Sequence, residues 1–121
     1  MTPMRGRRTG APEPAERLIQ GAVLDHWRRL GLPGTLVAAI PNARAFGQAG
    51  LTAGLFDLMV IAPGLPVAFL ELKTRAGRMS REQERFRLLL IAAGVPHAVT
   101  YGRDEPIAVL AKWGVVRRAA A

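Results

Sequence analysis

Cysteine is absent from the 121-residue chain, and histidine occurs only twice. The absence of cysteine excludes disulfides, thiolate metal sites and cysteine nucleophiles, and two histidines are too few for a His-rich zinc site. No apolar run approaches the roughly 18 residues of a membrane span, and the basic start leads into no apolar signal segment. We therefore expect a cytoplasmic protein without a membrane partner, in which any metal ion is held by oxygen ligands.

Acidic residues are scarce as well. Nine Asp and Glu stand against seventeen Lys and Arg, which gives a formal net charge of +8. Lys73 and Lys112 are the only lysines, so the basic residues are almost all arginine, whose planar fork suits phosphate oxygens. A polyanion, and nucleic acid first, is the expected partner. The alternative is that arginine simply occupies solvated surface positions.

Length and composition predict a single globular domain. Hydrophobic residues make up 50% of the chain and charged residues 21%, which is the usual mixture for a folded protein. Residues 1–12 combine proline, glycine and arginine with little to bury, so we expect a mobile basic arm there. The domain itself is expected over residues 13–114, followed by a C-terminal tail at 115–121.

The spacing of apolar residues predicts a mixed α/β fold. Helices are expected where apolar side chains recur every three or four positions, at residues 15–30, 80–94 and 104–113. Strands are expected in β-forming runs bounded by turn residues, at 35–40, 55–62, 67–73 and 95–101. The order of these elements predicts a mixed central sheet flanked by helices. In the second helix, we expect the apolar face to consist of Phe86, Leu89, Leu90 and Ala93.

Two carboxylates stand inside the apolar strands. Asp57 and Glu71 are the only charged residues between positions 46 and 72. A carboxylate among apolar neighbours is costly unless it is paired, hydrogen-bonded or bound to a cation. If Ile61 pairs with Val67 around a five-residue loop, Asp57 lies directly opposite Glu71, with Cβ atoms about 4.5–5.5 Å apart.

Two carboxylates at that distance repel each other unless a divalent cation lies between them, and oxygen ligands suit Mg²⁺ or Mn²⁺. Lys73 shares the strand face of Glu71, where it could position or deprotonate a water or stabilise charge developing on a phosphate. These groups are the ones that phosphodiester hydrolysis needs. The alternative is a structural Asp57 or Glu71 satisfied by Lys73 or by backbone donors, although one lysine cannot neutralise two carboxylates.

An aspartate in one strand, followed after a hairpin by Glu71-Leu72-Lys73, resembles the PD-(D/E)XK nuclease core. More specifically, the chain resembles the VRR-NUC (virus-type replication-repair nuclease) family over about residues 13–114. The motifs that match are Pro41-Asn42-Ala43-Arg44, Gly50, Gly54-Leu55-Phe56-Asp57-Leu58, Glu71-Leu72-Lys73, Gly77-Arg78-Met79-Ser80 and Gln83. The resemblance implies a restriction-endonuclease-like αβββαβ core. One residue departs from the pattern: Phe56 occupies the position where the family usually has proline.

The resemblance also implies an activity. It indicates a metal-dependent DNA endonuclease of bacterial or phage origin, a hydrolase that selects branched, Holliday-junction or flap DNA in replication, repair or phage DNA processing. Asp57 and Glu71 would be metal ligands, together with the backbone carbonyl of Leu72, and Lys73 would be the catalytic lysine. Because one small domain covers little DNA, we expect a homodimer acting on branched or duplex DNA.

Two further positions correspond to the family pattern, and each has a second interpretation. Glu16 corresponds to the acidic residue of the family's first helix and would complete a set of three carboxylate ligands, but it could equally be a first-turn glutamate favoured by the helix dipole. Gln83 corresponds to the family's glutamine after the lysine, but it could equally close a capping box with Ser80.

Arginines cluster around these positions. Phosphate contacts are expected from Arg44, Arg75, Arg78, Arg81 and Arg85, which would position DNA without reading its sequence. The alternative is a solvated basic face. At the level of function, the competing hypothesis is a non-catalytic nucleic-acid-binding module that kept the nuclease fold. A site-specific restriction enzyme would need sequence-reading loops that a chain of this length does not offer.

Overall fold

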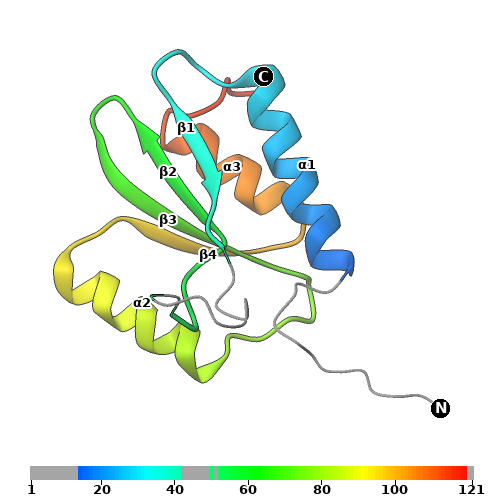
Figure 1. The fold of residues 1–121 in the computed structure, drawn as a ribbon. Helices are drawn as coiled ribbons and strands as arrows, with labels where there is room; N and C mark the ends of the chain where they lie inside the picture. The colour runs from blue at the N-terminus through cyan, green and yellow to red at the C-terminus, as the bar shows by residue number, and fades with distance from the viewer. Residues whose placement is uncertain (1–13, 42–49, 51, 120–121) are drawn as a thin grey trace.

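The computed structural model describes residues 14–41, 50 and 52–119 (Figure 1). The predicted basic arm at residues 1–12 and the position of Arg44 lie outside the described residues. Within the described part, no helix is long and apolar enough to cross a membrane.

The elements follow the predicted order of helix, three strands, helix, strand and helix (Figure 1). The helices are α1 (Pro14–Leu30), α2 (Arg81–Ala93) and α3 (Asp104–Lys112). The strands are β1 (Leu36–Ala39), β2 (Leu58–Ala62), β3 (Leu65–Lys73) and β4 (His97–Tyr101). The prediction of an α/β fold with this arrangement is confirmed.

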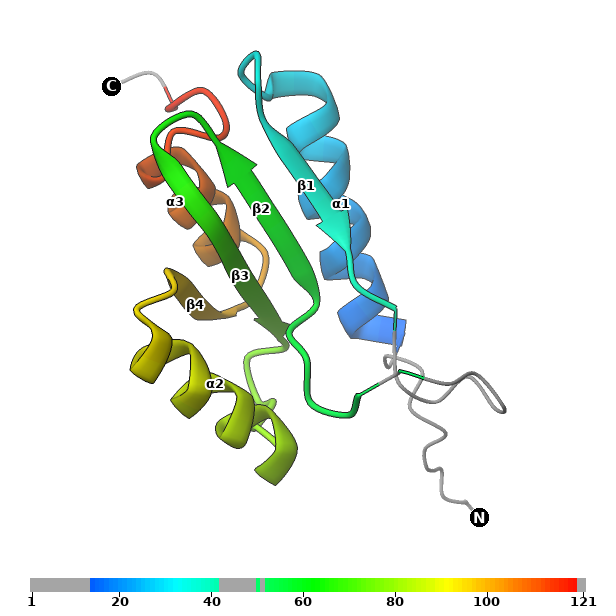
Figure 2. The same cartoon turned by 60° about the vertical axis from the view of Figure 1, so that its left-hand side comes forward.

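The strands form one mixed sheet in the order β1-β2-β3-β4. β1 pairs with β2 and β2 with β3 in antiparallel fashion, whereas β3 and β4 are parallel because α2 carries the chain back between them. Figure 2 shows β1 and β4 at the two edges, so the strand that carries Glu71 and Lys73 is an inner one.

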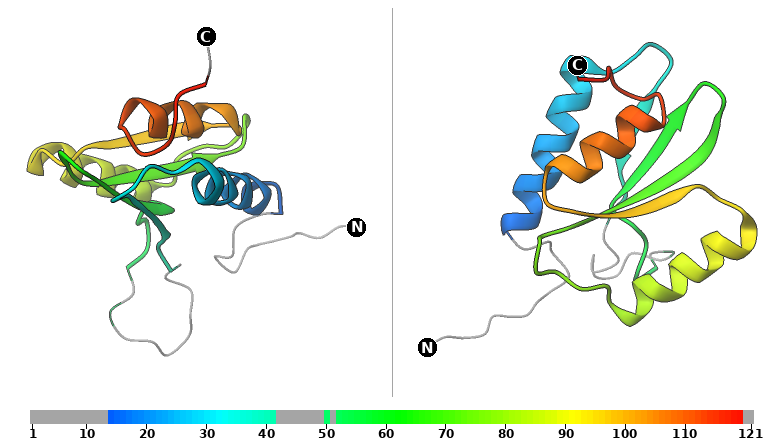
Figure 3. Two further views of the ribbon diagram at one scale, coloured as in Figure 1. Left: turned by 90° about the horizontal axis from the view of Figure 1, so that it is seen from above. Right: turned by 180° about the vertical axis from the view of Figure 1, so that it is seen from behind.

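Helices α1 and α3 cover one face of the sheet (Figure 3). Because side chains alternate along a strand, the even-numbered residues of β3 face these helices. The resulting core also includes two valines that follow α3, so packed structure continues two residues past the expected domain end at 114. Its fully buried members are Val23, Val37, Leu58, Val60, Ala62, Ala68, Leu70, Leu72, Leu110, Val115 and Val116.

The tip of the β2–β3 hairpin differs from the expectation. Instead of an Ile61–Val67 pair around a five-residue loop, the register shifts after residue 60 and Ala62 pairs with Leu65. A two-residue turn suffices because Gly64 adopts a φ of 76°, which closes a tight connection without a Cβ penalty. β3 therefore begins two residues earlier than predicted, and the irregularity in the register absorbs the difference.

Helix α2 begins and ends where its capping residues predict, after Ser80 and before Gly94. Its buried side differs from the expected one. Leu90 is buried, but Leu89 is 62% exposed and Ala93 is exposed too. The helix contacts the rest of the molecule along a narrow stripe that includes Gln83 and Leu90, so only residues at that spacing are covered.

Candidate active site

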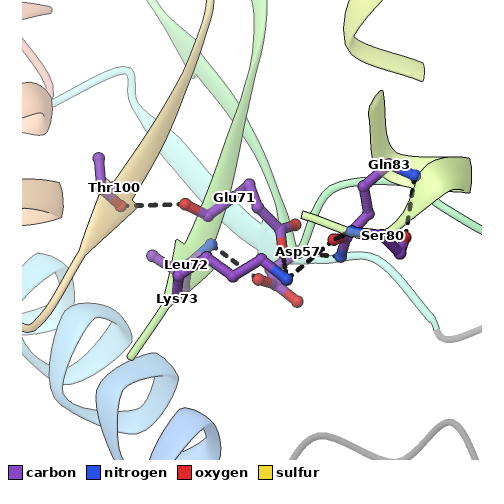
Figure 4. A network of polar contacts seen from close by, with 7 residues as sticks. All are labelled: Asp57, Glu71, Leu72, Lys73, Ser80, Gln83 and Thr100. Carbon is purple, nitrogen blue, oxygen red and sulfur yellow. Dashed lines mark hydrogen bonds and ion pairs between the residues drawn. The ribbon is translucent and has the colours of Figure 1, made fainter. Parts of the chain in front are cut away.

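Asp57 and Glu71 meet at the ends of the two central strands (Figure 4). Residues 58–60 pair with 68–70 in the predicted register, which makes Asp57 and Glu71 the next opposed positions. Asp57 lies just before β2 and not inside it. Its side chain, and not its backbone, pairs with β3 at this point, because Asp57 Oδ2 accepts a hydrogen bond of 2.8 Å from the backbone N–H of Leu72. The carboxylate is thereby fixed across the end of β3.

Glu71 and Lys73 project from the face of β3 opposite the α1 and α3 core. Glu71 is 2% exposed and Lys73 is 6% exposed, so both charges are buried. Lys73 Nζ lies 3.4 Å from Glu71 Oε2. The backbone carbonyl of Glu71 accepts a hydrogen bond from Thr100 Oγ1 at 3.0 Å, which ties this part of β3 to β4.

Gln83 connects helix α2 to this pair (Figure 4). Its Nε2 donates to Glu71 Oε2 at 2.8 Å, and its Oε1 accepts from Lys73 Nζ at 2.8 Å. The same Oε1 accepts the backbone N–H of Ser80 at 2.9 Å, while Ser80 Oγ accepts the backbone N–H of Gln83. The capping-box interpretation of Gln83 is confirmed, and the same amide also bridges Glu71 and Lys73, while its role in a reaction stays a prediction.

The environment favours the protonated form of these carboxyls in the metal-free protein. Burial, and after it the nearby Asp57, raise the pKa of Glu71 to about 8, while Lys73 acts in the opposite direction. Burial also raises the pKa of Asp57, against the effects of the Leu72 N–H, of hydrogen bonding to Glu71 and of Lys73. One lysine thus faces two carboxyl groups, of which Glu71 is buried and Asp57 is half-buried.

The two oxygens of Glu71 differ in their surroundings. Oε2 has Gln83 and Lys73 as partners, whereas Oε1 is buried without a hydrogen-bond partner among the described residues. A buried carboxylate oxygen without a donor is costly unless a cation is bound to it. Together with Asp57, it forms an oxygen-only donor set that fits Mg²⁺ or Mn²⁺.

Glu16 lies in the first turn of α1. Across the described ranges, no group of three His, Asp or Glu side chains is placed to hold one metal ion, so the role of Glu16 as a third ligand stays a prediction. The backbone carbonyl of Leu72 is directed toward the same side of β3 as its N–H, which is the side of Asp57.

Phe56, the residue that departs from the family pattern, packs against α2 beside the site. It is 1% exposed, and its ring meets that of Phe86 edge-on with centroids 5.2 Å apart. Phe86 makes a similar contact with Phe69 in β3, at 5.4 Å. Proline would offer no comparable ring contact, so phenylalanine here contributes to the attachment of α2.

Solved structures share this architecture. One, a VRR_NUC domain, has 21% identity and a TM-score of 0.61, over 81% of this chain and 95% of its own. Another, a VRR_NUC domain protein, has 23% identity and a TM-score of 0.70, over 85% of this chain and 90% of its own. This chain has the VRR_NUC fold. No family model matches the sequence, and no curated protein matches it.

Within the VRR_NUC fold, the four candidate DNA-contacting arginines that the structure describes divide into two pairs. Arg75 and Arg78 lie in the turn that leads from Lys73 to α2 and are exposed. Arg81 and Arg85 are exposed too, but their spacing puts them on the side of α2 turned away from Gln83. The first pair is therefore closer to the site along the chain, and the second pair faces away from it.

Two residues that support the site in this VRR_NUC fold were given no role from the sequence: Gly54 was noted only as part of a matching motif, and Thr100 was not noted. Gly54 has a φ of 91°, and a Cβ there would overlap the backbone of Glu82, so only glycine lets this segment approach the first turn of α2. Its place three residues before Asp57 was the available signal. Thr100 offered one signal, a short hydroxyl side chain next to Val99 in the mostly apolar strand β4.

Proposed function

We propose that this protein is a metal-dependent deoxyribonuclease that hydrolyses phosphodiester bonds. The observation that carries the proposal is the meeting of two carboxyl groups, Asp57 and Glu71, beside one buried lysine, where Glu71 Oε1 is buried and receives no hydrogen bond from another residue. A purely structural carboxylate would be expected to find donors for both oxygens. Asp57, Glu71 and the Leu72 carbonyl would hold Mg²⁺ or Mn²⁺, which supplies Lewis-acid polarisation of the phosphate.

The chain's own residues would perform the remaining tasks. Lys73 Nζ has three N–H donors; one is directed to Gln83 and one toward Glu71, which leaves one for a phosphate oxygen or the attacking water. Because Lys73 is buried, this charge acts in a medium that screens it little. Arg75 and Arg78 would contact the DNA backbone at the edge of the site, where contacts position the strand without reading its sequence.

The substrate class and assembly are part of the same proposal. The net charge of +8 supports binding to DNA, and the small size of the domain supports a homodimer that presents two active sites to branched or duplex DNA. A cytoplasmic location in a bacterial or phage-infected cell would give access to such DNA. Light scattering should return twice the 13.0 kDa of one chain, and a mass of one chain would remove the dimer from the proposal.

The decisive experiment compares the two lysines of the chain. Labelled four-way junction, flap, duplex and single-stranded DNA are incubated with Mg²⁺, Mn²⁺ or EDTA, using the native protein, Lys73→Ala and Lys112→Ala. Lys112 is exposed on α3, so its substitution removes the same charge away from the site. We expect metal-dependent products from the native protein and Lys112→Ala, with cleavage by Lys73→Ala reduced at least about a hundredfold.

The opposite result is equally informative. If all three proteins bind DNA and none cuts it with either metal, the nuclease proposal fails. The chain would then be a nucleic-acid-binding module with a nuclease fold. If Lys73→Ala cuts as fast as Lys112→Ala, the activity does not come from this site.

A further inference from the structure

Ser80 stands at the start of α2 and takes part in two hydrogen bonds with Gln83. Its hydroxyl accepts the backbone N–H of Gln83 at 3.0 Å, and its own N–H donates to Gln83 Oε1 at 2.9 Å. These two bonds form a capping box, which normally serves only to begin a helix. Here the glutamine side chain that closes the box also reaches the two buried charges of β3.

The capping box determines which way the Gln83 amide is turned. Both groups that approach Oε1, the Ser80 N–H and the Lys73 ammonium, can only donate. The carboxylate at the other end of the amide accepts from Nε2. A rotated amide would place an NH₂ group against two donors, so the Ser80 N–H helps to hold the oxygen toward Lys73.

Lys73 depends on this acceptor for its position. Its side chain has four flexible methylene groups, and lysine ammonium groups shift readily between acceptors. Gln83 Oε1 lies 2.8 Å from Lys73 Nζ, compared with 3.4 Å to Glu71 Oε2. Loss of the fixed amide would let Nζ move toward the buried Glu71 carboxylate.

We propose that Ser80 is a positioning residue, which holds the Lys73 ammonium in place for reaction through the amide of Gln83. The inference rests on the proposed nuclease function for its kinetic consequence, but the link from Ser80 to Lys73 is made by the hydrogen bonds of the protein alone. Ser80 itself is exposed and lies outside the set of groups that touch the phosphate. It acts on the reaction only through its hydrogen bonds to Gln83.

The test uses substitutions of Ser80 in the full chain. Ser80→Ala removes the hydroxyl that binds the Gln83 N–H and so holds the glutamine where its Oε1 meets the backbone N–H of residue 80, which the variant retains. Ser80→Thr keeps the hydroxyl, and Ser80→Gly removes it while remaining an acceptable N-cap. Ala92→Gly is the matched control, because it weakens the exposed far half of α2 without touching Gln83. We expect kcat to fall about tenfold in Ser80→Ala and Ser80→Gly with KM for DNA unchanged, which corresponds to the loss of one well-placed hydrogen bond.

A second measurement needs neither metal nor substrate. The NMR signal of the Gln83 side-chain NH₂, assigned by its absence in Gln83→Glu, reports whether the amide is held. We expect Ser80→Ala and Ser80→Gly to move this signal toward that of a free glutamine, whereas Ser80→Thr and Ala92→Gly leave it in place and keep the native kcat.

Two results would overturn the inference: a native Gln83 signal and kcat in Ser80→Ala, or an equal loss of kcat in Ala92→Gly, which would mean that helix stability alone is responsible. If the native protein cleaves no DNA, the proposed function has failed, and the NMR signal then decides the link between Ser80 and Gln83 by itself.

Discussion

The two faces of the sheet are built on different principles. The face under α1 and α3 is closed by aliphatic side chains such as Leu70 and Leu72, which are at most 1% exposed. The opposite face carries Glu71 and Lys73, and α2 is attached there through a polar bridge and aromatic edges. One face supplies the burial that folds the chain, while the other holds charges that folding alone would not select. Alternate residues of β3 thus serve different purposes: those that face α1 and α3 stabilise the fold, and those on the opposite face supply the candidate site.

The largest expected effect on stability comes from a cavity in the core between the sheet and helices α1 and α3. Leu70→Ala removes a fully buried side chain between the sheet and the helices, and we expect it to lower the free energy of unfolding by about 2–5 kcal/mol. Urea denaturation measures this loss. Cleavage per folded molecule should remain close to native, because Leu70 points away from Glu71 and Lys73. A proportionate loss of activity at full folding would show that the two faces are not independent.

The second prediction concerns pH and the charged face. In the folded, metal-free protein the pKa of Glu71 is about 8, against an ordinary 4.5, so between these values the folded state holds a proton that the unfolded state has released. The stabilisation is complete below about pH 4.5 and is lost as the pH rises to 8, at up to about 1.4 kcal/mol per pH unit. The raised pKa of Asp57 acts in the same direction.

Urea midpoints measured in EDTA from about pH 5 to pH 9 test this sign, with Glu71→Gln as the comparison. The glutamine side chain of the variant does not ionise, so the free energy of unfolding should change less with pH. Near pH 9 it should exceed that of the native protein. Saturating Mg²⁺ should reduce the alkaline loss in the native protein, because a cation favours the ionised carboxylates. A native curve that rises with pH in EDTA would contradict the buried, protonated Glu71.

How far the sequence predicted these two faces depends on the kind of signal. The register assumed for the hairpin placed Asp57 opposite Glu71, and residues 58–60 keep that register although the hairpin tip differs. Alternation along β3 separated Leu72 from Lys73, since a slip of one residue would bury the wrong set. The sequence pattern could not reveal that β2 begins only after Asp57. An aspartate whose side chain accepts the Leu72 N–H cannot be distinguished in sequence from an aspartate inside the strand.

The orientation of α2 was harder to predict for a physical reason. Residues 88–91 are all aliphatic, so periodicity alone allows several buried stripes, and the expected one included Leu89. The actual stripe is selected by Gln83, a polar residue whose partners lie 10 and 12 positions earlier in the chain. The bridge from Gln83 to β3 could likewise be seen only in the structure. A capping box is a pattern of residues close together in the sequence, whereas the bridge joins residues that are far apart in it.

A smaller effect is expected where the two regions are joined. Gly54→Ala puts a Cβ against the backbone of Glu82 at a φ of 91°, so the segment before Asp57 must move away from α2. We expect a loss of about 1–3 kcal/mol in unfolding free energy, together with reduced cleavage by the folded protein. Gly64→Ala is the control, since it has a φ of 76° at the far hairpin tip and open space around it. It should cost stability through backbone strain without lowering cleavage, and equal effects of both variants on activity would argue against a special role for Gly54.

The smallest effect distinguishes the expected helix face from the observed one. Leu89 is 62% exposed while its neighbour Leu90 is 4% exposed, although both were expected to be buried. Leu89→Ala should therefore change the unfolding free energy by no more than about 0.5 kcal/mol, because surface substitutions away from special features stay in that range. Leu90→Ala should cost about 2 kcal/mol or more, since it leaves a cavity beneath α2. Thermal unfolding of the two single variants at one pH separates them, and a costly Leu89→Ala would mean that α2 sits on the sheet by the stripe the sequence suggested.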